Sequence, residues 1–279
     1  MNAANGPLVS VIIPTFNRAW AVGRAIDSVL EQDYRPFELI VVDDGSTDQT
    51  AEILARYGDQ LTVVCRENRG VSAARNAGVA RAQGDLIAFL DSDDFWRPQK
   101  LTVQVDFFTS RPDALICQTG EIWVRNGRRV NPGRRHRKLS GMIFTPSLEL
   151  CLVSPSAVMM RKTLFSMVGG FDEALPACED YDLWLRVTRR YPVYLIDAPL
   201  VVKTGGHPDQ LSAAPGLDQY RIRSILNLLE SNELTEDQKQ AAADVLARKC
   251  RIYADGCRKR GRIDEARHYE AIRSSVGYR

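Results

Sequence analysis

The sequence predicts an α/β fold with a mostly parallel central sheet, flanking helices and a small helical extension at the C-terminus. Short apolar runs rich in β-branched residues alternate with amphipathic segments in the first third of the chain, which is typical of βα units. From Gly216 onward, apolar residues recur at helix spacing instead. Because 279 residues with 44% hydrophobic side chains can bury one sizeable core, we expect one principal domain and a smaller appendage.

Four apolar runs predict the strands of the first half, at residues 9–13, 37–42, 61–65 and 86–90. Ser46 and Gln49 are spaced like a capping box, so we expect them to start the helix after the second run. Gly84 lies just past the helix expected over residues 73–82, where glycine commonly ends a helix. These joints predict four βα-type units by Asp91.

Beyond Pro98 the pattern predicts mixed topology. A helix comes first, and Asn126-Gly127 then marks the turn of a hairpin between residues 121–125 and 128–130. The elements expected next are a strand over residues 157–160, a helix from about Glu179 and a pair of strands near residues 193–202.

The C-terminal part is expected to be helical, with a break at Gly261. Its apolar residues at helix spacing include Ile222, Ile225, Leu226 and Leu229. Residues 251–269 loosely resemble one tetratricopeptide hairpin, but a solenoid needs about three stacked repeats for stability. We therefore interpret this part as a packing element or a docking surface.

Charge, cysteines and hydropathy exclude several classes. With 37 Lys and Arg against 35 Asp and Glu, the formal charge of +2 does not indicate a surface that grips a polyanion throughout. The six cysteines form no C-x-x-C pair, which argues against a zinc site or a disulfide framework and favours a reducing cytoplasm. Residues 1–7 lack signal-peptide features, and no run approaches the roughly 18 apolar residues of a membrane span, so we expect a cytoplasmic protein, soluble or peripheral.

The stretch LIAFLDSDD, residues 86–94, is an apolar strand that ends in three carboxylates. Side chains at i and i+2 point the same way at a strand end, so Asp91 and Asp93 can converge on one cation. Two carboxylates leave coordination positions for phosphate oxygens and water, which suits Mn²⁺ or Mg²⁺ on a diphosphate. The alternative is an acidic loop without a metal, because D-x-D is short and common.

Asp43 and Asp44 end the second expected strand in the same manner. At that edge of an α/β sheet, one of them can accept hydrogen bonds from the base or ribose of a nucleotide. Alternatively, these carboxylates satisfy N–H groups at a helix start. Asn17 and Arg18 follow the first expected strand. Alternatively, Asn17 is only a cap and Arg18 only a solvated charge.

Five segments together resemble family 2 of the glycosyltransferases: VSVIIPTFNR, ELIVVDDGSTD, NRGVSAARNAG, GDLIAFLDSDD and GGFDEALPACEDYDLWLR. The resemblance runs in order across residues 8–212. It implies the GT-A fold, a nucleoside-diphosphate sugar as donor, with a UDP-sugar expected first, and transfer with inversion. We accordingly expect a GT-A domain over residues 1–215, with a donor-nucleotide half (1–97) and an acceptor half (98–215), followed by the helical extension (216–279).

The resemblance also implies roles for single residues. Asp180 would be the general base, with Glu179 beside it, and the metal ligands would be Asp91, Asp93 and His207. The residues implied around the donor nucleotide are Pro14, Thr15, Asn17, Arg18, Asp43, Asp44, Arg75 and Ser92. Asp180 would take the proton of the acceptor hydroxyl in one in-line displacement, the acceptor being a glycan, a lipid-linked glycan or a protein.

Two of these assignments have structural alternatives. Glu179 and Asp180 precede a helix, whose positive end should favour their ionised form, but such a pair also merely stabilises a helix start. His207 follows the last expected strand and is alternatively a simple loop residue.

Residues 125–138, RNGRRVNPGRRHRK, contain eight basic side chains and no acid. This segment can cover a pyrophosphate, meet an anionic acceptor or touch an anionic membrane surface at its inner face. No aromatic residues interleave to stack bases, so nucleic acid is not expected. A solvated charged loop is the alternative.

Three tryptophans, Trp96, Trp123 and Trp184, are either sugar-stacking platforms or core residues. The rival from another class is a non-catalytic nucleotide-sugar binder or scaffold, against which the set of Asp91, Asp93 and Asp180 argues. A nucleotidyltransferase or a dinucleotide-dependent oxidoreductase would need a glycine-rich loop after the first strand, which PTFNR lacks. The sequence does not predict the oligomeric state.

Overall fold

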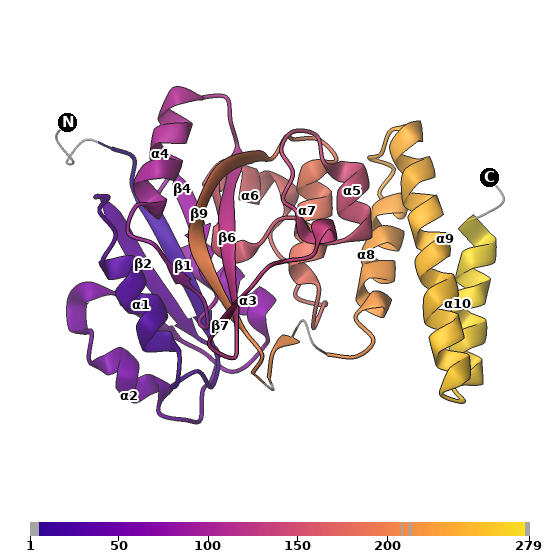
Figure 1. Ribbon diagram of the computed structural model, residues 1–279, viewed down its shortest axis with the longest axis horizontal. Coiled ribbons are helices and arrows are strands. Elements are labelled where there is room, and N and C mark those ends of the chain that lie inside the picture. Colours follow the sequence, from indigo (N-terminus) through magenta and orange to yellow (C-terminus); the bar gives the residue numbers. More distant parts are fainter. Residues whose placement is uncertain (1–5, 208, 212–213, 277–279) are drawn as a thin grey trace.

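The computed structural model describes residues 6–207, 209–211 and 214–276, and its centre is a nine-stranded mixed sheet (Figure 1). The strand order is β3-β2-β1-β4-β8-β6-β9-β5, with β7 paired to β6. The strands are β1 (Val9–Thr15), β2 (Phe37–Asp43), β3 (Thr62–Cys65), β4 (Leu86–Phe89), β5 (Phe95–Trp96), β6 (Ile116–Arg125), β7 (Arg128–Val130), β8 (Val158–Arg161) and β9 (Tyr194–Gly205).

The first four strands are parallel, as the sequence predicted. Beyond them, β8 runs antiparallel to both β4 and β6, β9 runs parallel to β6, and β5 runs antiparallel to β9. The predicted hairpin is confirmed, with Arg125 opposite Arg128. Asn126 and Gly127 both have positive φ, which a two-residue turn of this kind requires.

Ten helices are assigned within the described residues. They are α1 (Val22–Leu30), α2 (Thr50–Ala55), α3 (Val71–Arg81), α4 (Lys100–Ser110), α5 (Phe144–Glu149), α6 (Lys162–Val168), α7 (Glu179–Thr188), α8 (Asp218–Glu230), α9 (Glu236–Lys259) and α10 (Ile263–Val276). Short 3₁₀ turns are η1 (Gly58–Gln60), η2 (Arg134–His136) and η3 (Pro155–Ala157). The helix expected to begin near Glu179 and the break at Gly261 are both confirmed.

Alternate residues of β1 enter two cores, one on each face of the sheet. Val11 and Ile13 pack with α1 and α4, whereas Ile12 packs with α3, α6 and α7. This division follows from the two-residue period of a strand. Trp96 and Trp184 belong to these cores, so core packing is their role, while Trp123 is half-buried against His136.

The helices α8, α9 and α10 stand beyond α7 at one end of the molecule (Figure 1). A third core joins them to α5 and α7, with Tyr181 and Leu185 of α7 among its members. Thr235 and Gln238 form a complete capping box at the start of α9. No helix in the described part of the chain is long and apolar enough to cross a membrane.

Two local predictions are wrong. The capping box of Ser46 and Gln49 does not form: α2 begins at Thr50 without a side-chain cap from Gln49, because Ser46 Oγ accepts from the backbone N–H of Asn17 instead (2.9 Å). The strand pair near residues 193–202 is one strand, β9. Its pairing with β6 shifts register around Gly120, and such an irregularity lets the strand continue through Pro199.

Candidate active site

The carboxyl ends of β1, β2 and β4 meet at one edge of the sheet. Thr15 at the end of β1 lies opposite Asp43 at the end of β2. Asp91 comes two residues after the end of β4, which also pairs with β1. Parallel order therefore brings the predicted residues to the edge where α/β sheets bind ligands.

Hydrogen bonds join the loop after β1 to the loop after β2. Asn17 donates its backbone N–H to Ser46 Oγ, and its Oδ1 accepts from the backbone N–H of Thr47 (2.8 Å). The N–H of Arg18 donates to Thr50 Oγ1 (3.1 Å). Asn17 has φ of 50°, a region that asparagine visits more readily than most residues. These bonds make the two loops one connected wall of the site.

Asp43 and Asp44 are buried and already accept hydrogen bonds from backbone groups. Asp43 Oδ1 accepts from the N–H of Ser46 (2.9 Å), and Asp44 Oδ2 accepts from the N–H groups of Gly70 (2.7 Å) and Arg69 (3.1 Å). These bonds do not match the helix-start alternative, because Ser46 lies in the loop before α2 and Arg69 and Gly70 precede α3. Contact of either with a nucleotide stays a prediction.

Thr15 offers the clearest unsatisfied group at this edge. Its Oγ1 is buried and has no hydrogen-bond partner among the residues that the structure describes. Leaving a buried hydroxyl unpaired costs about 1–3 kcal/mol, so a ligand that bonds this oxygen would recover free energy. Pro14 and Ser92 are also buried here.

Arg75 of α3 bridges two of the predicted carboxylates. Its Nη2 donates to Asp91 Oδ1 (2.7 Å) and its Nη1 donates to Glu179 Oε1 (2.6 Å). The side chain is 5% exposed and its guanidinium lies over the ring of Phe171, 5.1 Å from the centroid. Arg75 thus joins the end of β4 to the start of α7, and its predicted place around the base and ribose stays a prediction.

Burial and charge act against each other on these groups. Burial alone would raise the pKa of Asp91, but Arg75 and then Lys203 more than offset it, and the pKa is lowered. The pKa of Glu179 is raised, because burial and the charge of Asp180 outweigh Arg75. The expectation that the helix start favours ionised Glu179 is therefore wrong. For Arg75, the two carboxylates outweigh burial and raise the pKa.

Asp180 lies in the first turn of α7, after Cys178 in a left-handed conformation with φ of 61°. Its Oδ1 accepts from the backbone N–H of Tyr181 (2.7 Å), and its Oδ2 accepts from Cys151 Sγ (3.5 Å). Burial and then Asp180 raise the pKa of the Cys151 thiol well above its usual value, so this thiol is neutral. Asp180 also interacts electrostatically with Lys203, as Asp91 does.

Asp93 and His207 lie together. His207 Nε2 is 2.7 Å from Asp93 Oδ2, and its Nδ1 is 2.7 Å from Asp209 Oδ1. Asp209 also pairs with Arg18, and Trp20 lies 5.2 Å from the imidazole, ring centroid to ring centroid. Burial and then the charge of Asp91 raise the pKa of Asp93.

The donor set fits Mn²⁺ or Mg²⁺ in its chemistry, since carboxylate oxygens and an imidazole are ligands that these ions take. Within residues 6–207, 209–211 and 214–276, no three His, Cys, Asp or Glu side chains are grouped to hold a metal. Asp91 is bonded to Arg75, whereas Asp93 is bonded to His207. Any cation would therefore depend on oxygens of a ligand as well as on the protein.

Sequence reasoning assigned no role to three buried charged residues, Asp94, Glu121 and Lys203. Asp94 Oδ1 accepts from the N–H of Thr204 (2.9 Å), and burial raises its pKa well above the usual value. Lys203 of β9 donates to Ser154 Oγ (3.2 Å), and the charges of Glu121, Asp94, Asp91 and Asp180 outweigh burial and raise its pKa. A lysine inside the apolar run LVVK, just before His207, was the available signal.

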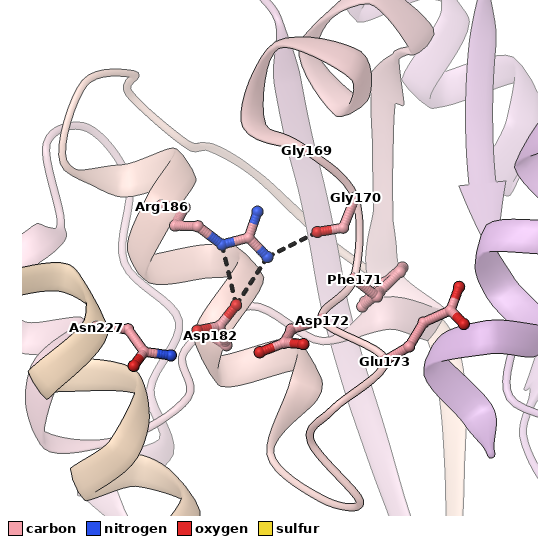
Figure 2. Close-up of a pocket in the computed structure, with 8 residues that line it drawn as sticks. All are labelled: Gly169, Gly170, Phe171, Asp172, Glu173, Asp182, Arg186 and Asn227. Atoms are coloured by element: carbon pink, nitrogen blue, oxygen red, sulfur yellow. Dashed lines mark hydrogen bonds and ion pairs between the residues drawn. The ribbon is translucent and has the colours of Figure 1, made fainter. Parts of the chain in front are cut away.

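A separate cavity of about 400 Å³ lies beside α7 (Figure 2). Figure 2 shows Arg186 bonded to Asp182 and to the carbonyl oxygen of Gly170 at its wall. Its lining comprises Gly169, Gly170, Phe171, Asp172, Glu173, Asp182, Arg186 and Asn227. None of the predicted site residues lines it, so the cavity does not define the chemical site.

Sequence comparisons match the chain along much of its length. The family described as "Glycosyl transferase family 2" matches residues 10–168, and "Glycosyltransferase like family 2" matches residues 133–214. An uncharacterised glycosyltransferase of Rickettsia typhi is 33% identical over 221 residues, 77% of this chain and 69% of that protein. This chain covers 35% of the length of a longer uncharacterised glycosyltransferase of Rickettsia conorii.

Another relative is the putative teichuronic acid biosynthesis glycosyltransferase TuaG of Bacillus subtilis. It is 45% identical over 125 residues, which are 43% of this chain and 50% of TuaG.

Solved structures share the fold at low identity. Residues 1–349 of TarS from S. aureus, in complex with UDP-GlcNAc, superpose with a TM-score of 0.66 at 20% identity, covering 97% of this chain and 93% of that one. The mannosyltransferase PcManGT of Pyrobaculum calidifontis, in complex with GDP-Man and Mn²⁺, gives 0.59 at 19%, covering 99% and 78%.

Proposed function

Because this chain belongs to family 2 of the glycosyltransferases, we propose that it transfers a sugar from a nucleoside-diphosphate sugar to an acceptor hydroxyl. The chain is thus a glycosyltransferase with the GT-A fold. One observation carries the proposal: Arg75 bonds both Asp91 and Glu179, next to Asp180. A UDP-sugar is the donor we expect first, and the UDP-GlcNAc complex of TarS supports this choice.

On the donor side, we assign the base and ribose to the wall formed by the loops after β1 and β2. Thr15 Oγ1 supports this assignment, because it lacks a partner among the described residues. Asn17 and Asp44 fix the backbone of that wall through their hydrogen bonds. The remaining residues proposed here are Pro14, Arg18, Asp43, Arg75 and Ser92.

Asp91, Asp93 and His207 are the residues that would hold Mn²⁺ or Mg²⁺. A bound divalent cation supplies positive charge for a departing diphosphate. Mn²⁺ in the complex of PcManGT supports a metal of this kind. Apart from the metal, Arg75 keeps the pKa of Asp91 low, which maintains its carboxylate in the ligand form.

Asp180 is proposed as the general base of an inverting transfer. Its carboxylate accepts the hydroxyl proton while the acceptor oxygen forms a bond to C1 and the bond from C1 to the diphosphate oxygen breaks. Nucleoside diphosphate leaves on the opposite face, so the configuration at C1 inverts. Cys151 approaches Asp180 Oδ2 as a neutral thiol and therefore adds no competing charge.

We further propose that residues 1–97 bind the donor, residues 98–215 bind the acceptor and residues 216–279 form the appended helical part. An acceptor on a growing glycan, lipid-linked or protein-linked, is consistent with the putative teichuronic acid pathway of TuaG.

The test combines donor screening with Asp180→Asn. Thermal shift with UDP-, GDP- and dTDP-sugars, with and without Mn²⁺, identifies the donor, since ligand at about 100 times its Kd adds roughly 2.7 kcal/mol of stability. We expect Asp180→Asn to lower nucleotide release by about 10²–10⁴ while donor affinity is kept.

Asp172→Asn, a nearby acid outside the network, is the matched control and should retain turnover. Equal losses of turnover and donor affinity in Asp180→Asn would refute the role of the base. Tight donor binding by the wild type without any nucleotide release would instead support a non-catalytic binder.

A further inference from the structure

Residues 125–138, named here the basic segment, carry six exposed arginines and contain no acidic residue. They run through β7 and η2, and the exposed side chains are Arg125, Arg128, Arg129, Arg134, Arg135 and Arg137. Across the described part of the chain, none of these six arginines forms an ion pair, whereas Arg75, Arg186 and Arg189 each pair with an acid. Unpaired guanidinium groups are well suited to bind phosphate or carboxylate with paired hydrogen bonds.

The basic segment ends at a buried lysine, Lys138. Lys138 Nζ lies 3.2 Å from Glu121 Oε1 and donates to Gln118 Oε1 (2.8 Å). The side chains of Lys138 and Glu121 are only 11% and 7% exposed. Burial would raise the pKa of Glu121, but Lys138 and Lys203 lower it to about 2, so this carboxyl is ionised.

Lys203 connects the Lys138–Glu121 pair to the proposed base. Lys203 interacts electrostatically with Glu121 and also with Asp180. The buried end of the basic segment is therefore coupled electrostatically, through Lys203, to Asp180.

An aromatic pair lies among the arginines. The rings of Trp123 and His136 are 5.2 Å apart between centroids and tilted by 58°, and the guanidinium of Arg125 lies 6.0 Å from the centroid of Trp123. Tryptophan combines a large apolar face with a polar edge. Apolar ring faces beside cations fit a sugar ring that bears an anionic group.

We propose that the basic segment binds the acceptor, and that this acceptor is a glycan chain carrying phosphate or carboxylate groups. The inference rests on the proposed function. A chain whose terminal hydroxyl reaches Asp180 would lay its preceding anionic units along Arg128, Arg129 and Arg134. A glycan is favoured over a membrane surface because the basic segment runs inward from its exposed arginines to buried Lys138, where a planar headgroup layer has no access.

The experiment compares two variants of the full chain with equal change in charge. The first replaces Arg128, Arg129, Arg134 and Arg137 by Gln. The control replaces four exposed arginines by Gln, namely Arg251 in α9, Arg260 just after α9, and Arg267 and Arg273 in α10. Probes are polyphosphate, polygalacturonate and neutral dextran, together with vesicles of phosphatidylglycerol or of phosphatidylcholine.

We expect the wild type and the control to bind polyphosphate or polygalacturonate, and the first variant to bind it about 10- to 100-fold more weakly, because four charge contacts are lost. Affinity should fall with added salt. Which of the two anionic chains binds more tightly identifies the anion. Neutral dextran should not bind.

Equal affinity of both variants for the anionic chains would overturn the inference, as would equal binding of dextran. Binding to phosphatidylglycerol vesicles without binding to either chain would overturn it in favour of a membrane surface. UDP-sugar binding, measured by thermal shift, should be unchanged in the first variant. If the wild type also failed to bind a UDP-sugar, the result would count against the proposed function and not against the acceptor surface.

Discussion

Replacing Arg75 by Met tests the network on which the site depends. The substitution removes the partner of two carboxylates, Glu179 at 8% exposure and Asp91 at 27%. Breaking a buried ion pair by deleting one partner costs about 3–5 kcal/mol, because a charge is left buried without compensation. For a protein whose total stability is of the order of 5–15 kcal/mol, this loss is large.

The pH dependence separates charge from packing. In the wild type the pKa of Asp91 is lowered in the folded state, so its contribution to stability is present above the unfolded value of about 3.9 and is lost as the pH falls through the folded value. Without Arg75, burial raises the pKa of Asp91 and raises that of Glu179 further. Protonation at the lower pH then removes uncompensated charge from the folded variant. The difference in free energy of unfolding between variant and wild type therefore decreases from pH 7.5 to pH 5.

Urea unfolding at pH 7.5 and pH 5 measures the effect. Arg267→Met is the control, since Arg267 and its partner Asp264 are 73% and 98% exposed, and no change is expected. Adding Asp91→Asn to Arg75→Met should restore part of the stability. A penalty of the same size at both pH values, with no rescue, would show that lost packing against Phe171 is responsible and would refute the electrostatic reasoning.

Two further predictions concern the scaffold. Gly78→Ala should destabilise by about 1–3 kcal/mol in urea, because its Cβ would lie 2.4 Å from Ile12 Cγ2. The helical control Gly23→Ala meets nothing closer than 3.4 Å and should be neutral or stabilising; equal effects would contradict the clash. Burial lowers the pKa of Lys100 to about 7, so the unfolded chain binds more protons above that pH and stability should rise from pH 7 to pH 9. Lys100→Met should be more stable than wild type at pH 7, and the difference in free energy of unfolding should be smaller at pH 9. The same difference at both pH values would exclude this titration.

Local sequence patterns predicted the fold of residues 1–97 because each of the four parallel strands there is a continuous apolar run. Parallel pairing then brings the ends of β1, β2 and β4 together, which placed Asp43 and Asp91 at one edge without knowledge of side-chain contacts. The capping box failed for a reason that lies outside its own segment. Ser46 accepts from Asn17, which is 29 residues earlier in the chain.

Residues 98–215 were harder to predict because their strand pairings are long-range. Glu121 of β6 and Lys203 of β9 meet because these strands are parallel neighbours, although Pro199 resembles a strand end. Neither residue lies in a motif, and each looks like an ordinary charge in a half-buried strand. Their importance appears only when the sheet order is known.

The distribution of charge at the site favours completion by an added cation. Arg75 and Lys203 both lower the pKa of Asp91, so this carboxylate is ionised. Burial and the charge of Asp91 raise the pKa values of Asp93 and Asp94. His207 acts to lower the pKa of Asp93 and Lys203 that of Asp94, but neither offsets the increase. The protein thus keeps Asp91 ionised, but it does not supply enough positive charge to do the same for Asp93 and Asp94. A divalent ion next to Asp91 and Asp93 would supply that charge at the point where a diphosphate must be bound, which supports the proposed metal dependence on electrostatic grounds.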